Sequence, residues 1–191
     1  MKPPISGVVL VRIASQVASK LLTKTADSAV YRPMASDFHL DRIDRKILVN
    51  LQAEGRLTNE ALSERVSLSP SACLARVRRL EREGIIQGYH ARLDPFRVEV
   101  GLVLFAEVTL RGHRTDDLAR FDEVVGTIAE IVEASHVSGP FDYILKVVVP
   151  DLGRWSLIGD NLTATAGADR IVTHVLLHKP KVFVGYPVAQ R

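Results

Sequence analysis

The sequence predicts an α+β protein built in two parts, and three observations carry this prediction. Apolar residues recur at helical spacing between residues 40 and 92, whereas residues 101–191 alternate strand-like and helical segments. The chain of 191 residues is 47% hydrophobic and 25% charged, which is typical of globular proteins and too apolar for a disordered chain. Its length allows two small domains.

Residues 1–39 differ in composition from the rest and are predicted to be an N-terminal extension, either disordered or not native. They contain one apolar run, Gly7 to Val11, which is too short for the hydrophobic core of a secretory signal. Met34 stands just before the regular pattern begins. We therefore expect residues 1–33 to be disordered or absent from the native product.

Three helices are expected between residues 40 and 92. The apolar stripe of the first consists of Leu40, Ile43, Ile47, Leu48 and Leu51. The second begins after Thr58, a good N-cap, and the third after Ser69, with Pro70 at its first position and Gly84 at its end. Two short helices joined by a turn of three or four residues are typical of a helix-turn-helix. Residues 85–93, with a turn at Gly88, suit a small wing or an exit strand.

The second half is expected to follow the order βαββαβ, a ferredoxin-like sheet with two helices on one face. The alternation of apolar residues and the turn signals place four strands at 102–110, 131–137, 141–149 and 171–177. Helical patterns cover 116–127 and 151–162. The open face of such a sheet must be covered, so a homodimer that packs sheet against sheet is expected.

Charge is distributed unevenly along the chain. Residues 40–92 carry ten Lys/Arg against seven acids, whereas residues 93–191 carry ten against thirteen. A basic first half beside an acidic second half suggests that only one part meets a polyanion. Solvated charge alone would produce the same numbers.

The third helix has two distinct faces. At about 100° per residue, Cys73, Val77 and Leu80 form a buried stripe. Arginines and small residues occupy much of the remaining surface, where a helix could enter the major groove of DNA. Phosphate could be bound at the helix start. The candidate DNA-binding residues are Ser69, Ser71, Ala72, Ala75, Arg76, Arg78, Arg79 and Arg82. The alternative is that the arginines only pair with Glu81 and Glu83.

Three blocks of sequence resemble the Lrp/AsnC family of bacterial and archaeal transcription regulators. They are Leu40 to Leu48 (LDRIDRKIL), Leu68 to Glu81 (LSPSACLARVRRLE) and Val137 to Lys146 (VSGPFDYILK). The resemblance covers residues 40–180 without a major insertion. It implies a winged helix-turn-helix at 40–100 that binds double-stranded DNA. Residues 101–191 would then be an effector and oligomerisation domain that responds to leucine or another small amino acid.

The resemblance also implies where the effector binds and how the chain assembles. In the family, dimers often form octamers or other rings, and the ligand sits between effector domains. The effector-binding residues carried over are Gly139, Phe141, Asp142, Tyr143, Leu152 and His174. His174 stands where leucine-responsive members are expected to have tyrosine, which leaves the amino acid open. The Asp142 carboxylate needs a partner: a ligand ammonium, a backbone N–H or an arginine of another subunit.

No catalytic constellation is recognisable, so we expect a regulator that is not an enzyme. We also expect no cofactor and no metal: the histidines show no ligand spacing, and the single Cys73 suits buried packing in a reducing cytoplasm. No apolar stretch is long enough for a transmembrane helix. The alternative is an enzyme on the same scaffold, such as a siroheme decarboxylase, using residues such as His90, His113, His136 and His174.

Overall fold

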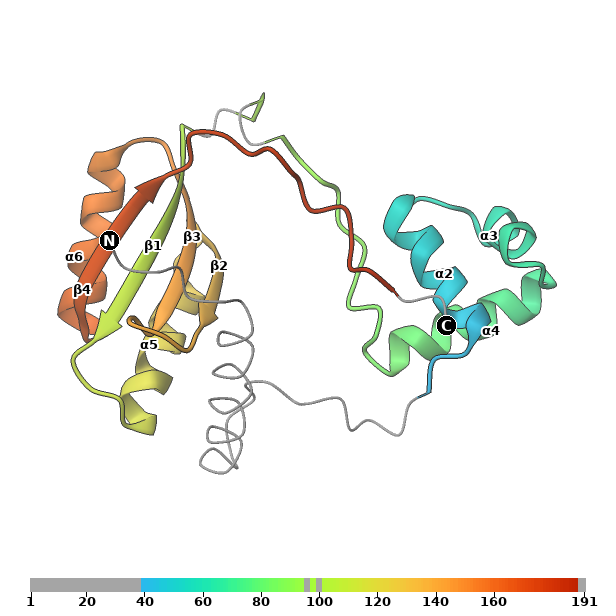
Figure 1. Ribbon diagram of the computed structural model, residues 1–191, viewed down its shortest axis with the longest axis horizontal. Coiled ribbons are helices and arrows are strands. Elements are labelled where there is room, and N and C mark those ends of the chain that lie inside the picture. Colours follow the sequence, from blue (N-terminus) through green and yellow to red (C-terminus); the bar gives the residue numbers. More distant parts are fainter. Residues whose placement is uncertain (1–38, 95–96, 99–100, 189–191) are drawn as a thin grey trace, which may run out of the picture. The chain divides into compact units, whose positions relative to one another are not determined.

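The computed structural model describes residues 39–94, 97–98 and 101–188 (Figure 1). The predicted N-terminal extension lies outside these ranges, apart from His39. The first half contains the helices α2 (Arg42–Ala53), α3 (Asn59–Val66) and α4 (Pro70–Arg82). These are the three helices that the apolar periodicity predicts. Ile47, Leu62, Val66, Cys73 and Leu80 form their common core, each at most 2% exposed.

Local hydrogen bonds set where these helices begin. Asp41 caps α2 because its Oδ1 accepts the N–H groups of Ile43 and Asp44 at 2.8 Å each. The Asp44 carboxylate accepts the Asp41 N–H in return, which completes a capping box. Ser67 ends α3 in the left-handed region, at φ 58°. This residue makes the tight turn into α4, where glycine would be less strained.

Residues 85–94 follow α4 without forming a strand, so the expected wing or exit strand is an irregular segment in the described residues. Gly84 (φ 68°) turns the chain out of the helix. The N–H groups of Ile85 and Ile86 both bond the carbonyl of Leu80, at 2.9 and 3.1 Å. These bonds satisfy the end of α4 as in other glycine-terminated helices.

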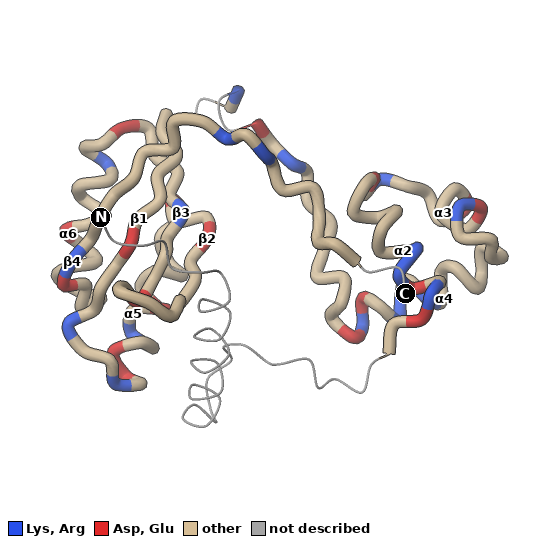
Figure 2. The backbone as a smooth tube through the Cα atoms, viewed as in Figure 1, with Lys and Arg blue, Asp and Glu red and all other residues tan. Residues whose placement is uncertain are grey.

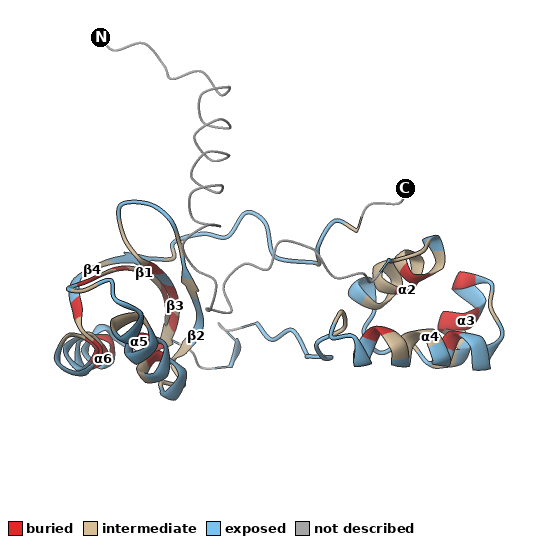
Figure 3. Cartoon of the chain, turned by 90° about the horizontal axis from the view of Figure 1, so that it is seen from below, coloured by how far each residue is buried: buried red, intermediate tan, exposed pale blue. Residues whose placement is uncertain are grey.

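The second half is a four-stranded antiparallel sheet with two helices on one face (Figures 1 and 3). The strands are β1 (Leu102–Leu110), β2 (Ile131–His136), β3 (Tyr143–Val149) and β4 (Ala168–Val175), arranged in the order β2-β3-β1-β4. The helices are α5 (Thr115–Thr127) and α6 (Leu152–Thr165). The predicted βαββαβ order and α+β class are confirmed.

The core of this half lies between the sheet and its helices. Alternate residues of β1 and β3 are buried there, and Phe121 of α5 and Leu162 of α6 pack against them. β4 begins three residues before the predicted start, because Ala168 pairs with Leu110 across an irregularity after Thr109. None of the helices in the described ranges combines the length and apolar character that a membrane span requires.

Candidate functional site

Helix α4 presents a solvent-exposed face beside its buried stripe. Ser69 caps the helix by accepting the Ala72 N–H at 3.3 Å, and Pro70 occupies the first turn. Six of the eight predicted DNA-binding residues are exposed, namely Ser69, Ser71, Ala72, Ala75, Arg78 and Arg82. Small side chains at the start of a helix allow its backbone to approach base edges or phosphates closely.

The other two candidates, Arg76 and Arg79, are half-buried and engaged within the protein. Arg76 Nη1 donates to Asp41 Oδ2 at 2.6 Å and to Asp44 Oδ1 at 2.9 Å. Arg79 Nη2 donates to Asp44 Oδ2 at 2.6 Å. The Asp44 side chain is fully buried. These two arginines therefore link α4 to the start of α2, a role that the helical periodicity of the sequence did not predict.

The charges of this cluster are mutually stabilised. Burial alone would raise the pKa of Asp41, but hydrogen bonds from the Asp44 N–H and from Arg76 outweigh it and hold the pKa at about 2. The same carboxylates raise the pKa of Arg76, with Asp41 contributing most. Asp41 and Arg76 are accordingly a pair of ions at neutral pH.

Arg78 and Arg82 are the arginines of α4 that make no ion pair within the part of the chain that the structure describes. Figure 2 marks basic residues along both α2 and α4. Glu81 accepts a 2.9 Å hydrogen bond from Tyr89 instead of pairing with an arginine. The alternative, in which Glu81 and Glu83 neutralise the arginines, is not seen: neither glutamate forms an ion pair with an arginine of α4 within the described contacts. Positive charge therefore remains available on this face.

The predicted effector loop follows β2. Gly139 has φ 149°, which an L side chain rarely adopts. The Asp142 carboxylate, 15% exposed, accepts the Leu110 N–H at 2.8 Å and lies 3.0 Å from His113 Nε2. Of the three partners considered for Asp142, a backbone N–H is the one present. His113 is a neighbour that sequence reasoning did not assign to this loop.

Phe141 belongs to this loop, but the other three predicted effector residues do not meet there within one chain. Tyr143 faces the helices, where its hydroxyl donates to Asp122 Oδ1 at 2.8 Å. His174 Nε2 lies 3.2 Å from Glu107 Oε1 on the opposite face of the sheet. Leu152 begins α6, beyond the far end of β3. A seven-residue strand spans about 23 Å, so Leu152 and Asp142 are well separated.

Family models match both halves of the chain. One for winged helix-turn-helix DNA-binding domains matches residues 40–87, and one for the Lrp/AsnC ligand binding domain matches residues 103–184. The leucine-responsive regulatory protein of Escherichia coli K12 is 46% identical over 143 residues, which cover 74% of this chain and 87% of that protein.

The chain belongs to the Lrp/AsnC family.

Solved structures of similar regulatory proteins share the fold. A transcriptional regulator of Neisseria meningitidis in complex with L-methionine is 37% identical, with a TM-score of 0.72. The match covers 78% of this chain and 97% of that one. A feast or famine regulatory protein of Mycobacterium tuberculosis complexed with L-methionine is 32% identical, with a TM-score of 0.67, over 75% and 96% of the two chains. This chain is thus an Lrp/AsnC transcription regulator with a DNA-binding and a ligand-binding domain.

Proposed function

We propose that this Lrp/AsnC protein binds specific DNA sequences through α4 and that an amino acid bound to its second half changes that binding. The observation that carries the proposal is the exposed face of α4. That face combines a capped start, small residues and two arginines without an ion pair in the described contacts. It belongs to the half that matches a DNA-binding family.

The two kinds of exposed residue suit two kinds of DNA contact. Ser71, Ala72 and Ala75 are small enough to lie against base edges in the major groove. Arg78 and Arg82 can neutralise phosphates or bind guanine in a bidentate manner. The Asp44 cluster with Arg76 and Arg79 would keep α4 at a fixed orientation to α2. This division assigns DNA contact to Arg78 and Arg82 and positioning to the other two arginines.

The amino-acid half of the proposal rests on the ligand-binding family match and on two relatives whose structures contain L-methionine. Gly139 gives the 137–142 loop an open backbone near which a ligand carboxylate can approach closely. The Tyr143 side chain points away from this loop toward α5, and Leu152 and His174 lie at a distance from it. A site that uses all six predicted residues therefore needs more than one copy of the chain. Leucine, methionine or another small amino acid is the proposed effector, with no further cofactor.

A homodimer is the assembly that suits the open face of the sheet. Apolar residues there alternate with the buried ones of the other face, so Phe105, Ile144 and Val172 lie on the side away from α5 and α6. Such a face is stable when a second copy covers it. Larger rings built from these dimers, and a cytoplasmic location, complete the proposal.

A regulator accounts for α4 better than an enzyme does. A decarboxylase on this scaffold would not require exposed arginines and small residues on a capped helix. The relatives that match are named transcription regulators. A change in visible absorbance when siroheme is added to the purified chain would favour the enzyme instead.

A mobility-shift titration tests the proposal. The full chain is titrated against the DNA upstream of its own gene at low salt, with and without each of the twenty amino acids. A specific shift that one amino acid alters is expected. A shift that no amino acid changes would refute the effector half, and no shift at low salt would refute the DNA half, because electrostatic binding is strongest there.

A further inference from the structure

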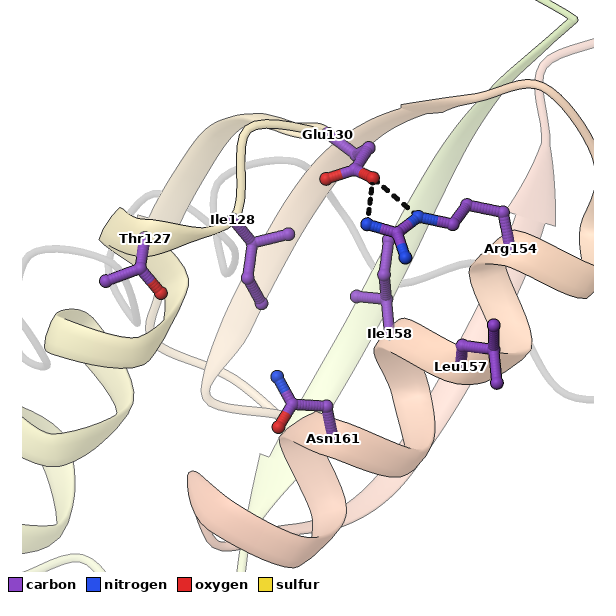
Figure 4. A pocket seen from close by; sticks show the side chains of 7 residues that line it. All are labelled: Thr127, Ile128, Glu130, Arg154, Leu157, Ile158 and Asn161. Carbon is purple, nitrogen blue, oxygen red and sulfur yellow. Dashed lines mark hydrogen bonds and ion pairs between the residues drawn. The ribbon is translucent and has the colours of Figure 1, made fainter.

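A second candidate site lies on the helical side of the sheet, away from the 137–142 loop. A pocket of about 330 Å³ opens between the turn that joins α5 to β2 and the exposed side of α6 (Figure 4). This volume is at the small end of the range for ligand sites. Its wall consists of Thr127, Ile128, Glu130, Arg154, Leu157, Ile158 and Asn161.

A charged pair stands at one end of this pocket. Arg154 Nε donates to Glu130 Oε1 at 2.6 Å, and Arg154 Nη2 contacts the same oxygen. Arg154 holds the pKa of Glu130 below its usual value, so the carboxylate is ionised at neutral pH. The side chains keep 47% and 24% of their surface exposed, respectively. A ligand can therefore reach both charges.

The backbone holds both charged residues in place. The Glu130 carbonyl accepts the Val148 N–H at 2.8 Å, which fixes it to the sheet. The Arg154 N–H donates to Asp151 Oδ1 at 2.8 Å within the first turn of α6. Because a sheet hydrogen bond holds the Glu130 backbone and α6 carries Arg154, a bound ligand would meet an anion and a cation at two defined positions.

The rest of the pocket is apolar with a polar group on the far side. Ile128 and Ile158 lie between the charged pair and Asn161 in Figure 4. The amide oxygen of Asn161 accepts a hydrogen bond from Thr165 at 3.2 Å. Its amide nitrogen, directed toward Ile128, donates no hydrogen bond within the described contacts. The pocket thus offers an aliphatic surface beside two opposite charges.

We propose that this pocket is a second binding site for an α-amino acid with an aliphatic side chain. The ammonium group would pair with Glu130, the carboxylate with Arg154, and the side chain would cover Ile128 and Ile158. A ligand with one charge would leave Glu130 or Arg154 without its counterion, so a zwitterion is the better complement. The inference rests on the proposed function, in which the second half of the chain binds an amino acid. It adds a second binding site for an amino acid in that half.

Opening the existing pair costs little. An ion pair with this much solvent exposure is weak, and a zwitterion replaces both of its interactions. The guanidinium can bind a ligand carboxylate with two parallel hydrogen bonds, which is stronger than its present contact with one oxygen. The exchange therefore favours binding.

Equilibrium dialysis with labelled L-leucine and L-methionine on the full chain tests this site. Arg154→Met keeps the aliphatic stem and removes the charge, and Arg120→Met is the matched control on the exposed surface of α5. We expect Arg154→Met to lose one equivalent of bound amino acid per chain, or to bind it at least tenfold more weakly. Arg120→Met should match the wild type. 4-Methylpentanoate and leucinamide, which each lack one charge, should not compete.

Three further measurements make the other outcomes interpretable. Circular dichroism reports whether the variants are folded, DNA affinity without ligand reports on the first half, and gel filtration reports their assembly. Equal binding by Arg154→Met and the wild type overturns the second site and leaves the proposed function intact. Unchanged binding with a smaller assembly overturns it too, because the pocket would then be a contact between copies. No binding of either amino acid by the wild type, with DNA binding intact, overturns this site and also excludes leucine and methionine as the effector in the proposed function.

Discussion

The Arg79 guanidinium donates a 2.6 Å hydrogen bond to the carboxylate of Asp44, which is fully buried. The two residues are 35 positions apart and belong to α4 and α2. Arg76 contacts the same carboxylate through its other oxygen. This shared buried acid separates the arginines of α4 into two that hold the helix and two that face solvent.

Removing the buried acid should destabilise the helix-turn-helix. Asp44→Ala leaves Arg76 and Arg79 without their shared partner, and we expect the free energy of unfolding to fall by about 3 kcal/mol. Glu54→Ala is the control because it removes the exposed pair with Arg65 and should cost under about 1 kcal/mol. Urea denaturation followed by circular dichroism measures both. Equal losses would contradict the role given to Asp44.

The first half of the chain should lose stability in acid as Asp41 becomes protonated. Its folded pKa of about 2 is below its ordinary value of 3.8, so its contribution is present above pH about 4 and lost as pH falls toward 2. The carboxylate is half-exposed, so solvent screening reduces the effect to about 1 kcal/mol. Unfolding curves between pH 2 and 5 should show a flatter dependence in Asp41→Asn. An identical slope in the variant and the wild type would contradict this role of Asp41.

Ser67 should be a site where glycine stabilises. Its φ of 58° is strained for a residue with a Cβ, and glycine adopts it without that cost. Glycine also gains entropy in the unfolded chain, which offsets part of this relief, so Ser67→Gly should raise the free energy of unfolding by under about 1 kcal/mol. Ser67→Ala keeps the strain and serves as the control. Thermal melts of the two variants compare them directly, and a gain in alanine alone would refute the explanation.

The buried indole N–H of Trp155 has its hydrogen-bond acceptor on β4. Its Nε1 donates to Thr173 Oγ1 at 2.8 Å, and the residue is 7% exposed. Thr173→Val leaves this N–H unsatisfied and should cost about 1–3 kcal/mol. Thr163→Val on α6, where no side-chain hydrogen bond is described, is the control. Trp155 is the single tryptophan of the chain, so its fluorescence follows unfolding of this half.

Local signals account for what the sequence predicts correctly. Thr58 and Ser69 cap α3 and α4 where their residue types indicate, and Pro70 enters α4 in its first turn. Apolar alternation identifies β1, and the turn before Tyr143 locates β3. These features depend on residues a few positions apart, which a sequence displays directly.

Contacts between distant segments were not predictable in the same way. Nothing near Arg76 or Arg79 indicates that their partners lie more than 30 residues earlier, so helical periodicity alone placed both among the candidate DNA-binding residues. The pairing of Glu130 with Arg154 likewise depends on how α6 packs over the sheet. The start of β4 was missed because exposed Asp169 and Arg170 interrupt its apolar pattern.

Fluorescence anisotropy of a labelled duplex from the chain's own upstream region tests the central claim, that the exposed arginines of α4 contact DNA. The affinity of the wild type and of Arg78→Ala/Arg82→Ala is measured over a range of salt concentrations. If each arginine meets one phosphate, the double variant should lose about 1.8 from the slope of log affinity against log salt. Its affinity at low salt should also fall, with its unfolding curve unchanged. Equal affinity and equal slope in the two proteins would contradict the assignment of this face to DNA.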